Sequence, residues 1–137
     1  MRRVSSPGVS ALAALALLAC GKPKTPQAVA EAFIDRYYIE RNHAQALALA
    51  TGMAASRVAA EKKLVDEGQA EGAGSSAVQP HIYYRLRKTT PRGAELEWAF
   101  DLSIDSGGVL IKKEVRIVTS NAGPDSKVSF FNETDVP

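Results

Sequence analysis

The segment from Glu95 to Ile104 alternates regularly between small or polar residues and large apolar ones. Every second position in it is apolar, namely Leu96, Trp98, Phe100, Leu102 and Ile104. Because successive side chains of a strand point to opposite faces, this pattern predicts a strand with one buried and one solvated face. A half-solvated sheet must cover its apolar face with another layer. This requirement constrains the fold more than any other feature of the chain.

Three more strands are predicted to join the same sheet. Alternation is also found in residues 82–87 and 109–120, and residues 128–132 complete the set. The row expected to face inward in the third strand contains Val109, Ile111, Val115 and Ile117. The connections are short and rich in Gly, Pro and Asp, at positions 91–93, 105–108 and 121–126. Since such short turns join antiparallel neighbours, the four strands should form an antiparallel meander.

The N-terminal half carries helix signals instead. Thr25 supplies an N-cap hydroxyl and Pro26 a favourable first helical residue. The helix that follows should bury the apolar face made of Val29, Ala30, Phe33, Ile34 and Tyr37. Asn42 is predicted to cap a second helix, 43–50. A third helix is predicted over 53–67, with Ala54, Val58 and Val65 on one side, followed by a Gly-rich linker at 68–76.

These elements predict an α+β fold, with two or three N-terminal helices packed on one face of a curved four-stranded antiparallel meander sheet. A chain of 137 residues fits one such domain, which we expect to span residues 25–136. Residues 1–19 and 20–24 precede it as a separate leader and a short tether.

The leader has the features of a signal peptide. A positive start, Met1–Arg3, precedes the uncharged run of eleven residues from Val9 to Ala19. That run is shorter than the roughly 20 residues of a membrane-spanning helix. It ends in Leu-Leu-Ala-Cys-Gly, which resembles the lipobox of bacterial lipoproteins. The resemblance implies cleavage after Ala19 and lipid on Cys20. The alternatives are a plain secretory signal with an incidental cysteine, or a buried apolar helix.

Lipid on Cys20 would attach the chain to a membrane, since two or three acyl chains contribute about 0.8 kcal/mol per buried CH2. Gly21 stands where lipoproteins of the inner membrane commonly carry Asp, so the resemblance implies the outer membrane, facing the periplasm. The tether reaches about 15 Å when extended. The domain is therefore expected against the headgroups, with Lys22 and Lys24 within reach of anionic lipid.

Composition argues against several other classes of protein. Without Arg2 and Arg3 the chain has 15 Lys and Arg against 15 Asp and Glu, with no clustered basic stretch of the kind that nucleic acid requires. A single cysteine cannot form an intrachain disulfide, and the two histidines lack metal-ligand spacing. We therefore expect no nucleic-acid partner, no metal and no cofactor.

Helices followed by a bent meander are similar to the cystatin-like cone of the nuclear-transport-factor-2-like superfamily. Further positions resemble a group of small bacterial lipoproteins of unknown function, namely Pro26, Phe33, Tyr37, Asn42, Ala46-Leu47 and Ala50-Thr51. That group commonly has Trp in the last strand, where this chain has Phe130-Phe131. The resemblance implies a cone whose pocket, in different members, binds a small apolar ligand, holds an Asp/His pair or is filled by side chains.

Five residues are candidates for such a pocket. Tyr37, Tyr84, Trp98 and Phe100 would line it with apolar surface and polar groups, or would form ordinary core. Lys113 interrupts the apolar row of the third strand. It is accounted for by a bulge, by a stem that reaches the sheet edge, or by a cation at the pocket mouth that attracts an anionic head group.

The sequence thus favours a membrane-anchored, non-enzymatic module that binds a small apolar ligand or an envelope protein, with a homodimer as a further option. The alternative is a small-molecule enzyme of the isomerase type. Such an enzyme needs an inward-facing acid or base. His43 is expected in a solvated first turn and His81 at a strand entrance, with Asp35 and Asp101 on polar faces. No carboxylate–histidine pair and no catalytic residue are expected inside.

Overall fold

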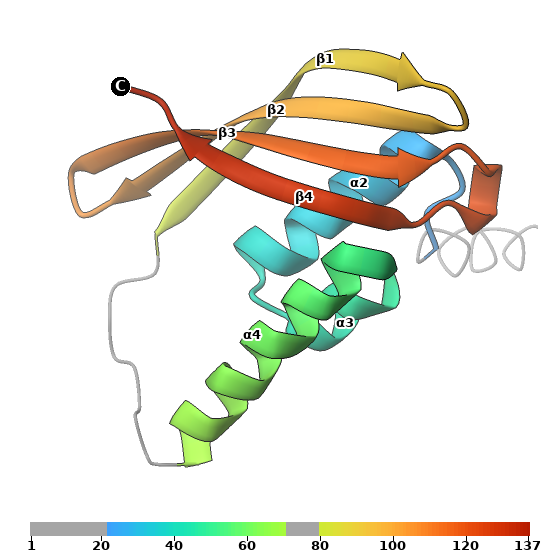
Figure 1. Ribbon diagram of the computed structural model, residues 1–137. Coiled ribbons are helices and arrows are strands. Elements are labelled where there is room, and N and C mark those ends of the chain that lie inside the picture. Colours follow the sequence, from blue (N-terminus) through green and yellow to red (C-terminus); the bar gives the residue numbers. More distant parts are fainter. Residues whose placement is uncertain (1–21, 71–79) are drawn as a thin grey trace, which may run out of the picture.

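The computed structural model describes residues 22–70 and 80–137 (Figure 1). In chain order the elements are α2 (Pro26–Ile34), η1 (Asp35–Ile39), α3 (His43–Ala48), α4 (Gly52–Ala70), β1 (His81–Arg92), β2 (Glu95–Ser106), β3 (Val109–Ser120), η2 (Gly123–Asp125) and β4 (Val128–Asp135). The α+β class, with helices preceding the sheet, is therefore confirmed. The predicted leader, Cys20 and most of the predicted linker lie outside the described residues.

The four strands form one antiparallel sheet in the order β1-β2-β3-β4, as the short turns predicted. The β2–β3 hairpin turns at Gly107 and Gly108, whose φ angles of 61° and 90° favour glycine. The register shifts once between β1 and β2 and once between β3 and β4, the latter at Val118/Thr119. The helices lie on one side of the sheet (Figure 1).

Helix α2 starts where the sequence predicted. The Thr25 hydroxyl accepts a hydrogen bond from the Ala28 backbone N–H at 3.1 Å, and Pro26 is in the first turn. Of its predicted apolar face, Val29, Ala30, Phe33 and Ile34 are buried, and the helix packs against β2, β3 and β4. After Ile34 the helix widens into the π-helical turn η1, which leaves the adjacent Tyr37 and Tyr38 both half-buried.

Helices α3 and α4 complete the layer. The side chain of Asn42 accepts a hydrogen bond from the Gln45 backbone N–H at 3.0 Å, which confirms the predicted cap. In α4, Ala54 and Val58, predicted on one side of the helix, are buried. Val65, predicted on the same side, is 41% exposed. The second half of α4 projects away from the sheet (Figure 1).

The alternating segment of β2 supplies the centre of the core. Trp98, Phe100 and Leu102 are buried, and on β3 they are matched by Val115 and Ile117. The prediction that Val109 and Ile111 continue this buried row is wrong, because they are 59% and 41% exposed. The β2–β3 hairpin extends past the end of the helical layer (Figure 1).

Lys113 stays in register on β3, opposite Leu102 on one side and Asp135 on the other. No bulge re-aims it. Its ammonium group donates to the Asp135 carboxylate at 2.7 Å, on edge strand β4. Of the three explanations for Lys113, the structure therefore supports the second, in which its aliphatic stem carries the ammonium group to the sheet edge.

Candidate functional site

The structure distributes the four candidate aromatic residues over three places. Trp98 and Phe100 belong to the core, and the Trp98 indole N–H donates to the buried Thr119 hydroxyl at 3.0 Å. Tyr84 packs edge-on against Phe100 and borders one hollow, whereas Tyr37 borders another. The core alternative thus accounts for Trp98 and Phe100, and the two tyrosines face separate surfaces.

The hollow beside Tyr84 has a volume of about 500 Å³ and follows α2 toward α3. The Tyr84 hydroxyl donates to the Asp35 carboxylate at 3.0 Å. Burial, and then this bond to Asp35, raise the pKa of Tyr84, so the phenol stays protonated. Asp35 was predicted on the polar side of the helix. Asp35 is half-buried there, and its carboxylate accepts the hydrogen bond from the neutral Tyr84 hydroxyl.

The second hollow, of about 320 Å³, lies at the end of the sheet opposite the start of α2, and we call it the distal hollow (Figure 1). Segments far apart in the sequence meet around it, because η1, the loop before α3, the middle of α4 and the ends of β1 and β2 all contribute. Its lining consists of Tyr37, Tyr38, Arg41, His43, Glu61, Val65, Pro80, Ile82 and Ile104.

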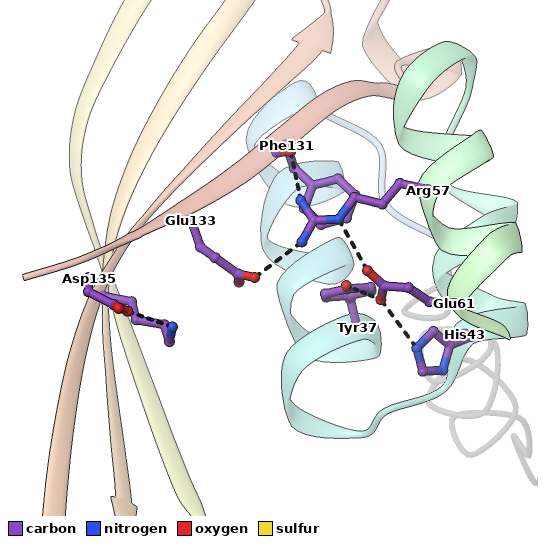
Figure 2. Close-up of polar contacts among 8 residues, drawn as sticks. Tyr37, His43, Arg57, Glu61, Phe131, Glu133 and Asp135 are labelled. Carbon is purple, nitrogen blue, oxygen red and sulfur yellow. Dashed lines mark hydrogen bonds and ion pairs between the residues drawn. The ribbon is translucent and has the colours of Figure 1, made fainter. Parts of the chain in front are cut away.

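Glu61 is the centre of a polar network beside this hollow (Figure 2). One carboxylate oxygen accepts from the Tyr37 hydroxyl and lies 3.8 Å from His43 Nε2. The other accepts from Arg57 Nε at 3.2 Å. Both oxygens are therefore engaged, and one guanidinium offsets the negative charge.

Arg57 extends the network from α4 to β4. Its guanidinium carbon lies 4.2 Å from the centre of the Phe131 ring, within the range of a cation–π interaction. The same group donates to the Phe131 carbonyl oxygen at 3.2 Å and to Glu133 Oε1 at 3.1 Å (Figure 2). One side chain thus ties the third helix to the last strand.

The two tyrosines of η1 differ in how their hydroxyls are satisfied. Burial, followed by the hydrogen bond to Glu61, raises the pKa of Tyr37, which therefore acts as a neutral donor. Burial and the nearby Glu133 also raise the pKa of Tyr38. Yet the buried Tyr38 hydroxyl has no hydrogen-bond partner of normal geometry within the part of the chain that is described.

This difference predicts opposite outcomes for two conservative substitutions. Tyr37→Phe should lower the free energy of unfolding by about 1 kcal/mol, because Glu61 loses a donor. Tyr38→Phe should leave it unchanged or raise it by up to about 1 kcal/mol, because an unsatisfied buried hydroxyl is removed. Urea unfolding of both variants is the measurement. A loss in Tyr38→Phe as large as in Tyr37→Phe would contradict the assignment.

The expectation that His43 lies in a solvated first turn is wrong. The His43 side chain is only 15% exposed, and its ring meets Tyr37 edge-on at 5.6 Å between centroids. Arg41, at φ 55°, turns the chain back, and the Asn42 N–H donates to the Arg36 carbonyl at 2.7 Å. This tight loop places the first turn of α3 against η1.

His81 is the first residue of β1, as predicted, and it is exposed. Asp101 is on the solvated face of the sheet, where it pairs with Arg85 and Arg87. Glu61, Arg57 and Glu133 were not predicted as site residues. The one local signal was the spacing of four between Arg57 and Glu61, which places them on the same face of a helix.

The fold and the network define a class of protein, an α+β domain with helices against an antiparallel meander and a charged cluster joining α4 to β4.

Comparisons with protein-family models, with curated proteins and with solved structures found no match. Within residues 22–70 and 80–137, no helix is long and apolar enough to cross a bilayer. The same residues contain no group of three or more His, Cys, Asp or Glu side chains arranged to hold a metal ion.

Proposed function

We propose that the chain is a lipid-anchored envelope lipoprotein of the outer membrane, facing the periplasm, whose domain is a non-enzymatic binding module. The observation that carries this proposal is the position of Cys20. It follows the lipobox-like Leu17-Leu18-Ala19, and only residues 21–25 separate it from the start of α2 at Pro26. A lipid there would hold the domain against the bilayer.

The direction of α2 supports a binding role for the far end of the domain. The helix starts near the β1–β2 turn and runs toward the end of the sheet that carries the β2–β3 hairpin (Figure 1). A tether before Pro26 would therefore leave the distal hollow on the side away from the bilayer. A ligand or an envelope protein could approach it there.

The state of Glu61 favours binding over catalysis. A general base must be free to accept a proton from the substrate. Glu61 instead accepts from Tyr37 and Arg57, and Arg57 also holds Glu133. These contacts join η1, α4 and β4, so the cluster fixes the walls of the hollow.

The expression of Cys20→Ala in the native cell tests the anchor. Wild-type protein should fractionate with membranes and carry the mass of its acyl chains, and Cys20→Ala should lose both properties. Lys22→Ala, two residues along the tether, is the matched control and should remain membrane-bound. A Cys20→Ala protein that stays with the membranes, or wild-type protein of unmodified mass, would refute the proposal.

A second candidate, a small-molecule enzyme of the isomerase type, is favoured by the His43–Glu61 pair beside the hollow. Native mass spectrometry of the purified protein separates the two functions and also gives the subunit number, which tests the expected homodimer. A binding module should return its co-purifying ligand unaltered after incubation. A ligand converted by wild-type protein and not by His43→Gln would establish the enzyme.

A further inference from the structure

We propose that the distal hollow binds a small carboxylate that carries an apolar chain. This inference rests on the proposed binding function and names the class of ligand. Its basis is the contrast between the two sides of the hollow. One side is formed by aliphatic residues of the sheet and α4, and the other by polar groups that include Arg41 of the loop before α3.

The apolar side continues beyond the hollow itself. Ile104 of β2 pairs with Ile82 of β1 and with Ile111 of β3, so three isoleucines form one row across the same face of the sheet. Ile111 is 41% exposed, and Val109 on the same face is 59% exposed. Val65 of α4 lines the same hollow as Ile82 and Ile104. An aliphatic chain on this row would remove apolar surface from water.

The polar side carries one arginine, Arg41, that stands outside the Glu61 network. Its ionisable groups are Tyr37, Tyr38, Arg41, His43 and Glu61. Glu61 shares the cation Arg57 with Glu133, and the raised pKa of each tyrosine keeps it neutral. Arg41 forms no ion pair with any side chain in the described ranges. A guanidinium with free donors binds a carboxylate through paired hydrogen bonds.

The backbone holds Arg41 at the rim. Its φ of 55° is unfavourable for a residue other than glycine. Backbone hydrogen bonds on either side fix this conformation, from Glu40 N–H to the Asp35 carbonyl at 2.8 Å and from Asn42 N–H to the Arg36 carbonyl at 2.7 Å. The loop thus fixes the backbone from which the Arg41 side chain extends.

The size of the hollow limits the ligand. About 320 Å³ is at the lower end of the range for small-molecule sites. A short-chain carboxylate therefore fits better than a long lipid. Octanoate is a suitable probe, and octanol is a matched probe that lacks the charge.

The test uses the lipidated protein in phospholipid nanodiscs, with empty nanodiscs as the reference, and isothermal titration with each probe. Octanoate should bind about tenfold or more tightly than octanol, which is the effect expected from one charge-assisted contact. Equal affinity for the two probes, or no octanoate binding at millimolar concentration, would overturn the proposal.

Two variants locate the binding. Arg41→Asn removes the charge while suiting the positive φ, and it should weaken octanoate about tenfold and leave octanol unchanged. Val65→Glu, at an exposed helix position, should weaken both probes by placing a charge on the apolar side. Arg85→Asn is the control, because that arginine is 82% exposed on the opposite face of the sheet.

Equal weakening by Arg41→Asn and Arg85→Asn would overturn the assigned site. Failure of this inference is distinguishable from failure of the binding function. A co-purifying ligand that lacks a carboxylate, or a bound peptide, would refute the ligand class and leave a binding module.

Discussion

Phe131→Ala is expected to lower the free energy of unfolding by about 3–5 kcal/mol, the cost of deleting a large core side chain. Phe131 is 3% exposed. Its ring centroid lies 4.9 Å from those of both Phe33 and Tyr37, and the Arg57 guanidinium lies over the ring. The substitution would leave a cavity where α2, α4 and β4 meet. Since domains are stable by only about 5–15 kcal/mol in total, much of the protein's stability would be lost.

The adjacent Phe130 is a control of identical chemistry. It is 38% exposed, because neighbouring side chains of β4 point to opposite faces of the sheet. Phe130→Ala should therefore change the free energy of unfolding by less than about 1 kcal/mol. Urea unfolding of the two variants gives both values. Equal losses, or a larger loss for Phe130→Ala, would show that the register of β4 is wrong.

Sequence alone could not choose between these two phenylalanines. Alternation predicted the inward row of β2 because polar and apolar residues strictly exchange places there. In Phe130-Phe131 two apolar residues are adjacent, so the local pattern allows either to face inward. The register shift at Val118/Thr119 decides between them, and it depends on how β3 and β4 pair.

The sequence also could not predict where the buried core ends. Val109 and Ile111 continue the apolar row of β3, and Val65 continues that of α4, yet all three are exposed. Burial at these positions requires a second layer, and the sequence pattern of one element does not report where its neighbour ends. The fold class followed from local patterns, whereas the ends of the buried region did not.

The charged cluster escaped prediction for a related reason. Arg57, Glu61 and Glu133 each look like solvated surface residues in their own segments. Arg57 and Glu133 are 76 positions apart and meet only because α4 crosses β4. The hydrophobic pattern cannot report such a contact. The candidate site in the structure is therefore this polar network, whereas the sequence had pointed to a set of aromatic residues.

Arg57→Ala is expected to lower the free energy of unfolding by about 2 kcal/mol. It removes a cation–π contact and three hydrogen bonds, and it leaves Glu61 and Glu133 without their shared cation. The side chain is 36% exposed, so solvent screening reduces the ionic part of this effect. Arg57→Lys should recover less than half of the loss, because an ammonium cannot make the forked contacts or lie flat over the ring.

Lys62→Ala provides the matched control on the same helix. Lys62 also pairs with an acidic residue four positions on, Asp66, at 2.8 Å. That pair is solvent-exposed, and within residues 22–70 and 80–137 no hydrogen bond or ion pair joins it to a strand, so its loss should cost less than about 0.5 kcal/mol. A double-mutant cycle of Arg57→Ala with Glu133→Gln should give a coupling of about 1 kcal/mol that falls in high salt. If Arg57→Ala were as mild as Lys62→Ala, the network would be an ordinary surface ion pair and would not hold α4 against β4.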